Sequence, residues 1–491
     1  MLELISIVSA LCVGFLLVRA FDPVRNMQPL WAAVLFAIAL GSGIGIGLMS
    51  VIFFLLDVLG IATPVSIFGI DIVLIGILAW RSWRMRGDGT RSTSDGAAPP
   101  FRWTWLLAVA FGIALLMSGS RLVQMAAALP VGDWDAWAIW NLRAKFIAGP
   151  GGNWRYALSP LLSNTHPDYP LLLSAFVARA WKASGGTSTI APIVTAFAFF
   201  AALVALLVSA VTLLRSAASA ILAGLVILST TSLLIWVPAQ YSDIPIALYY
   251  LAAIALIFLA PSPMADERRA LLWAGVCAGL AAWTKNEGIA FLVILTIVFF
   301  LTALWRVGAR AALHRSGLLL AGAAPGILLT LWLKFFLAPA VDPLVTQGAS
   351  GLSRLLDVSR YAQVGEAFFK ELLNLGSGVA HPLILLAILV VTLRLQIEEP
   401  YRSPSLIAAV SLGLVFLSYC ATLVVAPYGL TWQLQTSFDR LFLQVWPSVL
   451  LILFVLLRSV VDAAPLATAS KGAIARKAPN RAPKRVPVKR G

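Results

Sequence analysis

The chain is poor in the residues that build metal clusters and disulfide frameworks. It has three cysteines and three histidines in 491 residues, and Cys12, Cys277 and Cys420 all fall inside long apolar segments. We interpret them as small buried apolar residues and not as a disulfide or metal-binding set. No CxxC, HExxH, Walker loop or GxGxxG motif occurs in a functional context. The glycine-rich stretch GSGIGIG at 41–47 lies within an apolar segment and predicts close helix packing.

Charged residues are also scarce, at 12% of the chain, whereas hydrophobic residues make up 60% and the mean hydropathy is +0.92. A water-soluble domain of this composition would expose large apolar patches, so the composition indicates a polytopic membrane protein. Apolar runs are expected to cross the bilayer as helices because backbone groups in lipid must bond internally. We predict an all-α fold with about 13 transmembrane helices, near 2–18, 30–56, 61–80, 103–120, 189–214, 217–237, 243–260, 270–284, 287–305, 316–337, 379–396, 405–425 and 440–458.

The basic residues have a sided distribution. A net charge of +15 is compatible with nucleic-acid binding, but its placement indicates topology instead, and no nucleic-acid partner is expected. When the spans alternate sides, 24 of the 36 Lys and Arg fall on one side, which is therefore predicted to be cytoplasmic. The odd number of spans then puts the N-terminus outside and the C-terminus in the cytoplasm. Glu3 precedes the first span and no cleavage site follows it, so we expect an anchor and not a removed signal peptide.

Three regions follow from this topology. Residues 1–102 hold three transmembrane helices and a basic cytoplasmic loop, residues 103–458 form the main helical core, and residues 459–491 form a basic, Pro-rich tail that is expected to be disordered. The tail is either a topology determinant or a contact for anionic lipid heads. The core has two long external loops, at 121–188 and 338–378.

The first external loop opens with VGDWDAWAIWNLRAKF, which places the carboxylates of Asp133 and Asp135 beside the membrane. Its tryptophans recur at spacing three, and we predict an interfacial helix with their rings toward the lipid; they are Trp134, Trp137 and Trp140. A carboxylate at this depth is a candidate general base.

The same loop continues into HPDYP, which contains His166, Asp168 and Tyr169. His166 is either a turn residue whose ring caps the next helix or a polar group that faces the Asp pair. The apolar stretch 168–182 is short for a crossing, so we interpret it as re-entrant or surface-lying.

Three further polar clusters are predicted on the external side. Asp243 opens a span in QYSDIP, where its alternative role is a helix N-cap. Lys285 and Glu287 lie in WTKNEG, a tight turn between two spans where charges are costly without a purpose. Asp439 and Arg440 start the last span, and because a helix N-terminus disfavours a cation, Arg440 is expected to have an anionic partner, either Asp439 or a phosphate.

Carboxylates and cations at headgroup depth fit one kind of chemistry. A lipid phosphate lies at that depth, and a group can be transferred from it to an acceptor hydroxyl or amine. The carboxylate takes the acceptor's proton while the cations stabilise the charge that gathers on the leaving phosphate. Such a transfer needs no nucleotide, in agreement with the lack of a phosphate-cradling loop.

The order of these motifs resembles that of the membrane glycosyltransferases of the GT-C superfamily, in particular an uncharacterised bacterial branch of the protein mannosyltransferase and aminoarabinose transferase group. The resemblance covers roughly 103–458, with the first three spans as an addition to the core. The motifs are GDWDAWAIW, HPDYPLL, YSDIPIAL, GLAAWTKNEG and TSFDRLFLQVWP. The resemblance implies a multi-pass protein of the bacterial inner (plasma) membrane that inverts a sugar taken from a polyprenyl-phosphate donor.

The resemblance also implies roles for single residues. An acidic residue of the first external loop is the base, here Asp133 or Asp135, and the W-D-A pattern favours Asp135. Many members have an Asp-Glu pair where this chain has Asp-Trp-Asp. HPDYP resembles the family's HPP segment, which makes His166 and Asp168 candidates for shaping the site, and Lys285 and Arg440 would face the lipid phosphate. No cofactor or metal is expected.

Other assignments stay open. A transporter also has many helices with embedded charges, although no internal repeat is visible. An inactive protein that binds lipid-linked glycans would keep Arg440 and Lys285 without needing Asp135. The acceptor is a glycan, a lipid or a protein. In the second external loop, GEAFFKELLNLG is either a lid over the site or a plain surface helix.

Overall fold

The structure is a computed structural model that describes residues 1–84, 103–149, 153–339, 353–376 and 381–460. The predicted C-terminal tail, part of the basic loop before residue 103 and part of the second external loop lie outside the described residues. Within these ranges every regular element is a helix, and nine helices are long and apolar enough to cross a membrane. They are α1 (Leu2–Ala20), α2 (Leu30–Val58), α3 (Pro64–Arg84), α4 (Thr104–Ala128), α7 (Ile190–Leu214), α12 (Asn286–Val307), α13 (Ala309–Trp332, continued by η5, Leu333–Leu337), α18 (Glu399–Val425) and α19 (Leu430–Leu456).

The prediction of an all-α polytopic membrane protein is thereby confirmed, whereas the count of thirteen spans stays a prediction. The four other predicted spans coincide with shorter or more polar helices. These are α8 (Ala217–Leu228) with α9 (Thr231–Trp236), α10 (Asp243–Leu259), α11 (Glu267–Thr284) and α17 (Pro382–Leu393). The predicted segment 217–237 is broken because α8 ends at Leu228 and Thr230 precedes a new helix.

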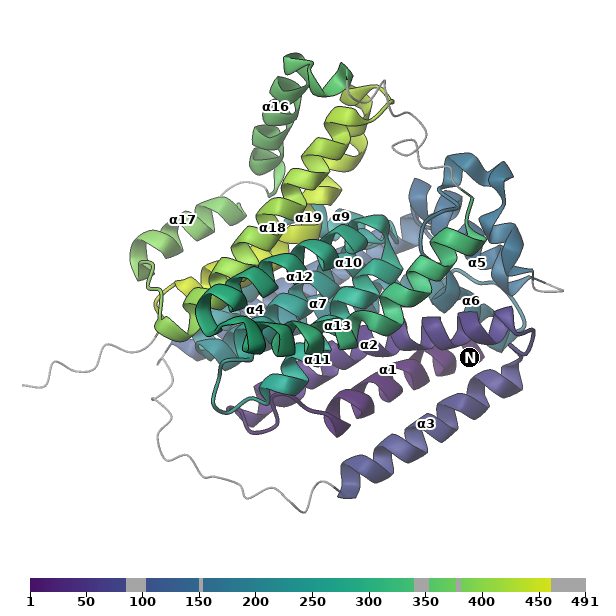
Figure 1. Ribbon diagram of the computed structural model, residues 1–491, viewed down its shortest axis with the longest axis horizontal. Coiled ribbons are helices and arrows are strands. Elements are labelled where there is room, and N and C mark those ends of the chain that lie inside the picture. The colour runs from purple at the N-terminus through teal and green to yellow at the C-terminus, as the bar shows by residue number, and fades with distance from the viewer. Residues whose placement is uncertain (85–102, 150–152, 340–352, 377–380, 461–491) are drawn as a thin grey trace, which may run out of the picture.

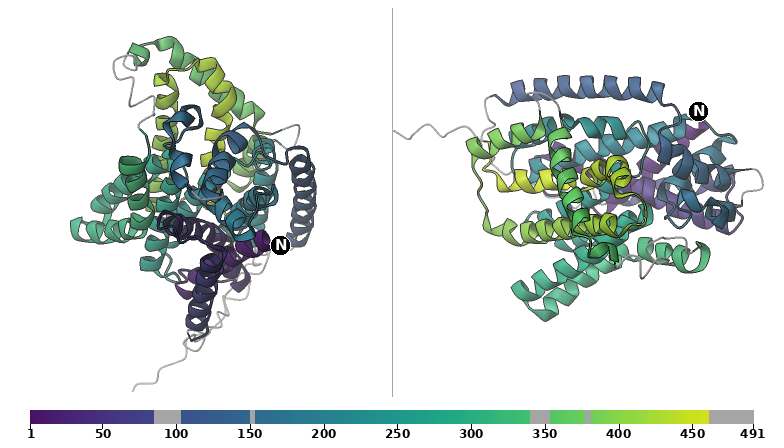
Figure 2. Two further views of the ribbon diagram at one scale, coloured as in Figure 1. Left: turned by 90° about the vertical axis from the view of Figure 1, so that its right-hand side faces the viewer. Right: turned by 90° about the horizontal axis from the view of Figure 1, so that it is seen from above.

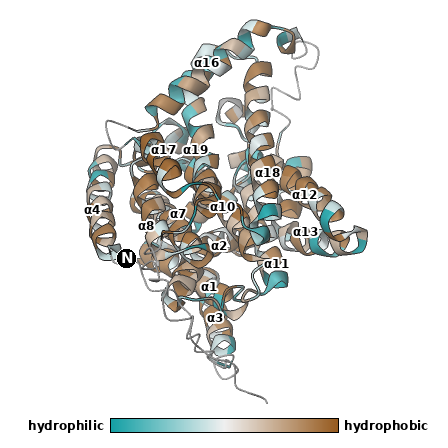
Figure 3. Ribbon diagram, turned by 90° about the vertical axis from the view of Figure 1, so that its left-hand side faces the viewer, coloured by the Kyte–Doolittle hydropathy of each residue, from teal (hydrophilic) through white to brown (hydrophobic). Residues whose placement is uncertain are grey.

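Helix α10 forms the centre of the bundle. All of its 17 residues are buried, and it packs against α7, α11 and α19 (Figure 1). The helices α3 and α4 are at the periphery, with only 17% and 11% of their most apolar windows buried. Figure 3 shows α4 as a largely hydrophobic ribbon set beside the bundle. An apolar helix with so little protein contact fits a lipid-facing position.

The N-terminal helices pack directly onto this bundle. A Cβ added at Gly14 of α1 would lie 1.9 Å from the carbonyl oxygen of Gly41 in α2, so the two backbones touch. This contact confirms the close helix packing predicted from GSGIGIG. Helix α2 also packs against α7 and against α6 (Leu172–Ser184).

Buried ion pairs join α6 to the N-terminal helices. Arg179 of α6 donates to both carboxylate oxygens of Asp71 in α3, at 2.7 and 2.5 Å, and Lys182 donates to Asp57 of α2 at 2.8 Å. Eleven of the 13 residues of α6 are buried. Helix α6 is therefore packed inside the protein, where α1, α2 and α5 (Asn141–Ala148) cover it, and its interpretation as re-entrant or surface-lying in the membrane stays a prediction.

The predicted first external loop, 121–188, begins with the end of α4 and continues with a π-helical turn, η2 (Ala136–Trp140), which runs into α5. Two short 3-10 helices follow, η3 (Trp154–Leu158) and η4 (Pro160–Thr165). Trp134 and Trp137 are half exposed and their rings contact each other, but Trp140 is buried. The three tryptophans thus do not share one outward face, because the π turn breaks the helical spacing on which that prediction relied.

The predicted second external loop contains the amphipathic helix α16 (Val358–Asn374), which packs on α18 and α19. Arg360 fixes it there by donating to the carbonyl oxygens of Leu423, Val424 and Ala426 at the end of α18. In Figure 1 and the left view of Figure 2, α16 projects from the side of the bundle opposite the N-terminal helices.

One end of the bundle collects residues that were predicted to share the cytoplasmic side. Arg215 after α7 pairs with Glu398 and with the carbonyl of Val455, and the backbone N–H of Arg458 donates to the carbonyl of Arg394. The polar clusters predicted on the other side lie at the start of α10, at the junction of α11 and α12, and in the first half of α19. The prediction that Asp439 and Arg440 start the last helix is wrong, because α19 already begins at Leu430. Arg215 contacts α19 near its C-terminal end, so the two sets of residues lie at different places along this helix.

Candidate functional site

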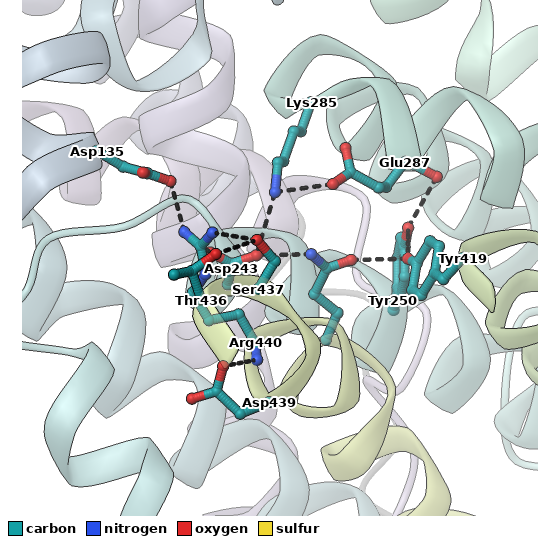
Figure 4. Close-up of polar contacts among 11 residues, drawn as sticks. Asp135, Asp243, Tyr250, Lys285, Glu287, Tyr419, Thr436, Ser437, Asp439 and Arg440 are labelled. Atoms are coloured by element: carbon teal, nitrogen blue, oxygen red, sulfur yellow. Dashed lines mark hydrogen bonds and ion pairs between the residues drawn. The ribbon is translucent and has the colours of Figure 1, made fainter. Parts of the chain in front are cut away.

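Charged residues from four distant parts of the chain converge at one point of the structure (Figure 4). Asp135 comes from the start of the π turn, Asp243 from the first residue of α10, and Arg440 from α19. Lys285 and Glu287 come from the junction of α11 and α12. The five residues, which we call the charged cluster, were predicted as site residues from four separate motifs.

Arg440 joins the segment before the π turn η2 to the last helix, α19. Its Nη1 donates to Asp135 Oδ2 at 2.5 Å, across 305 residues of sequence, and lies 3.9 Å from Asp243 Oδ2. Its guanidinium also lies over the rings of Tyr241, at 4.8 Å, and Trp236, at 5.6 Å. These aromatic faces stabilise a cation and fix the plane of the guanidinium.

Asp243 is the most buried carboxylate of the charged cluster, with 1% of its surface exposed. Oδ1 accepts hydrogen bonds from Gln444 Nε2 at 2.6 Å and from Lys285 Nζ at 3.3 Å. No side-chain cap is formed at the start of α10, so the N-cap role does not apply. Asp243 instead compensates two cations from other helices, as a buried carboxylate requires.

Lys285 is the single residue between α11 and α12 and has an extended backbone. The junction requires a glycine at position 288, because a Cβ there would lie 1.9 Å from the carbonyl oxygen of Ala281. Lys285 Nζ contacts Glu287 Oε1 at 2.8 Å as well as Asp243. Burial alone would lower the pKa of Lys285, but these two carboxylates raise it above its usual value, so the ammonium stays charged.

A hydrogen-bonded chain that the motifs did not reveal supports the charged cluster from inside the bundle. Gln444 Oε1 accepts from the Tyr419 hydroxyl at 2.7 Å, and the hydroxyls of Tyr419 and Tyr250 are 3.0 Å apart. The Tyr250 hydroxyl also donates to the backbone carbonyl of Glu287 at 2.9 Å. The chain links α10, α12, α18 and α19, so it fixes the relative positions of Asp243 and the α12 junction.

A second group of predicted residues lies around HPDYP. Asp168 Oδ2 accepts from Lys334 Nζ at 2.9 Å and from Asn286 Nδ2 at 3.2 Å. Burial favours the neutral acid, but Lys334 and Asn286 outweigh it and hold the pKa of Asp168 below its usual value. Asn286 directly follows Lys285, so this group adjoins the charged cluster. Lys334, in the π turn η5, was not predicted because it lies in an otherwise apolar segment.

Aromatic rings stack on one another close to Asp168 in the sequence. His166 stacks on Tyr169 with ring centroids 4.6 Å apart, and Tyr169 stacks on Trp140 at 5.9 Å. His166 has a positive φ of 48° and ends η4 without capping the next helix. Burial lowers the pKa of His166, so the ring is neutral near pH 7 despite the nearby Asp168.

Buried Arg143 holds this loop in place. Its Nη2 donates to the carbonyl oxygen of Tyr169 at 2.6 Å, and two of its other nitrogens have no hydrogen-bond partner among the described residues. Burial lowers the pKa of Arg143 to about 10, against the opposing charge of Asp168. Arg143 is therefore a positioning residue under the loop.

Two predicted acids lie apart from the charged cluster. Asp133 is exposed, and its Oδ1 accepts from the backbone N–H of Trp134 at 2.7 Å. Asp439 accepts from Trp236 Nε1 at 2.6 Å and from the backbone N–H of Arg440. The side-chain partner of Arg440 is thus Asp135 and not Asp439, since successive residues of a helix point in different directions.

The acids of the charged cluster are already engaged with cations. Among the described residues, no group of three or more His, Cys, Asp or Glu is arranged to hold a metal ion.

Compared with known proteins, the chain matches no family model, no curated protein and no solved structure. The resemblance to GT-C enzymes therefore stays a hypothesis that rests on motif order and on the geometry of the site.

Proposed function

We propose that the protein is an integral membrane glycosyltransferase of the bacterial inner membrane. It moves a sugar from a polyprenyl-phosphate donor to a hydroxyl or amine of a glycan, lipid or protein acceptor at the extracytoplasmic face. The observation that carries the proposal is the contact between Asp135 and Arg440. It joins a candidate base in the first external loop to a candidate phosphate ligand in the last helix.

The proposed step is a single displacement with inversion. Asp135 takes the proton of the acceptor, the acceptor atom bonds to the anomeric carbon, and the bond from that carbon to the phosphate oxygen breaks. The electron pair stays on the phosphate, where Arg440 and Lys285 stabilise the charge. Asp135 is the base and Asp133 is not, because only Asp135 reaches the charged cluster.

The remaining residues shape the site. Asp243 and Glu287 keep Lys285 charged and in place, while His166 and Tyr169 offer an aromatic surface and Asp168 positions Lys334. Aromatic faces and carboxylates are suited to bind a sugar, whose ring presents C–H groups on its faces and hydroxyls at its edge.

The test is transfer from radiolabelled polyprenyl-phosphate sugars by the purified protein. We expect wild type to remove the label from the lipid and Asp135→Asn to lose at least 100-fold in rate, about the contribution of a general base. The control is Glu366→Gln, which removes an exposed carboxylate on α16 that pairs with Lys370 of the same helix. Equal turnover by wild type and Asp135→Asn would exclude the proposed base. Uptake of sugar into vesicles with no bond cleaved would indicate a transporter, and lipid binding without turnover an inactive binder.

A further inference from the structure

Two carboxylates lie beside Arg440, and they differ in distance and in hydrogen bonding. Nη1 donates to Asp135 at 2.5 Å and lies 3.9 Å from Asp243 Oδ2, which has no hydrogen-bond partner among the described residues. Nη2 donates to Ser437 Oγ at 3.2 Å, and the buried Nε is also unpartnered there. The guanidinium thus keeps unused hydrogen-bonding capacity inside the protein (Figure 4).

The two carboxylates differ in how firmly they are held. Asp243 is fixed by Gln444 and Lys285 and its side chain is 1% exposed. Asp135 stands at the start of a loop turn, its side chain is 18% exposed, and Arg440 is the one side-chain partner that the described residues give it. A competing anion would therefore displace Asp135 and leave Asp243 in place.

We propose that Arg440 is a shared cation that holds the Asp135 carboxylate in the resting protein and passes to the phosphate of an arriving lipid, which releases Asp135. This inference rests on the proposed function, because it describes how that site is switched on. A carboxylate bonded to a guanidinium has its charge and a lone pair engaged and is a poor proton acceptor. A phosphate presents several oxygens to the planar guanidinium and can bond it in a bidentate manner, which suits Arg better than Lys.

The charge balance adds to the effect. Three carboxylates of the charged cluster, Asp135, Asp243 and Glu287, face two cations, Arg440 and Lys285. An incoming phosphate brings a further negative charge, which competes with the Asp135 carboxylate for the guanidinium of Arg440. Donor binding therefore frees the base. It follows that the donor binds before the acceptor, since an acceptor that arrives first meets an engaged carboxylate.

The test measures affinity and not transfer. Tritiated polyprenyl monophosphate, which carries no sugar, is titrated against the full-length protein in lipid nanodiscs. Asp135→Asn removes the internal competitor, so we expect it to bind the lipid about tenfold tighter than wild type, a change of ~1.4 kcal/mol. Arg440→Gln should bind at least tenfold more weakly, and the control Glu366→Gln should match wild type. Asp135→Ala, which leaves no amide behind, must show the same gain as Asp135→Asn.

A gain of affinity cannot result from misfolding, so the expected result is specific. Unchanged or weaker binding by both Asp135 variants overturns the shared-cation proposal. The outcome is separable from the proposed function. Tighter binding together with an absence of sugar transfer by wild type would refute the transferase and leave the shared cation intact. Loss of transfer in Asp135→Asn at unchanged lipid affinity would refute the shared cation and leave the transferase intact.

Discussion

Removal of the Asp243 charge is the sharpest test of how the charged cluster is held together. Asp243→Asn keeps the shape of the side chain and can still accept from Gln444, but it removes the negative charge that lies 3.3 Å from Lys285 and 3.9 Å from Arg440. Asp243 is 1% exposed, so water cannot replace the lost interaction.

The expected loss of stability depends on which ion pairs Lys285 and Arg440 retain in the variant. Removing one partner of a buried ion pair costs about 3–5 kcal/mol when the other charge is left alone. Here Lys285 retains Glu287 at 2.8 Å and Arg440 retains Asp135 at 2.5 Å. We therefore expect the lower end of that range, a loss of about 3 kcal/mol in the free energy of unfolding. For Asp135→Asn, whose ion pair is partly exposed, we expect about 1 kcal/mol.

The measurement is chemical denaturation of the purified variants in detergent micelles, followed by a spectroscopic probe of helix content. Wild type, Asp243→Asn, Asp135→Asn and Glu366→Gln are compared under identical conditions. The stability of Glu366→Gln should equal that of wild type. If Asp135→Asn loses as much stability as Asp243→Asn, or more, Asp243 is not the buried anchor of the cluster and the argument for an exchangeable Asp135 is lost with it.

Three further outcomes are expected. Gly288→Ala should cost about 3 kcal/mol in the free energy of unfolding, as an overpacked backbone contact does, and should reduce accumulation in the membrane. Gly69→Ala, whose added Cβ meets nothing within 4 Å, should do neither. Burial raises the pKa of Glu371 to about 7, so the folded protein loses stability as pH rises from about 4.5 to 7 and this buried carboxyl ionises. Glu371→Gln removes the ionisation. Thermal melts should therefore show that this variant is more stable than wild type at pH 8 and equally stable at pH 4. Tyr419→Phe leaves a buried glutamine oxygen unpaired and should cost about 1–3 kcal/mol by denaturation.

Much of the fold follows from apolar length alone. A run of about 20 apolar residues satisfies its backbone hydrogen bonds in lipid as a helix, so the positions of the long helices could be predicted directly from the sequence. The shorter helices could not be assigned in this way. Helix α10 is buried on all sides by other helices, and α11 begins with Glu267 and two arginines. For such segments, hydropathy does not separate a lipid span from a core helix.

Part of the charged cluster could be predicted from the sequence because its residues stand out against apolar surroundings. Charges at the ends of apolar segments are costly, so Asp135, Asp243 and Lys285 were visible as anomalies, and the structure brings them together with Arg440. Tyr419 and other polar members of the supporting chain were missed, because a tyrosine within an apolar run has no local signal that separates it from core packing. Their role depends on partners from other helices, and sequence spacing carries no information about these.

The ion pairs between α6 and the N-terminal helices have a consequence for biosynthesis. Asp71 leaves the ribosome 108 residues before its partner Arg179, and Asp57 precedes Lys182 by 125 residues. During that interval the nascent helices α2 and α3 carry carboxylates without these partners, which favours their retention beside the insertion machinery until α6 is translated. Ribosome stalling upstream of α6 should accordingly leave an intermediate that a membrane protease degrades, while stalling beyond it should yield a protected one.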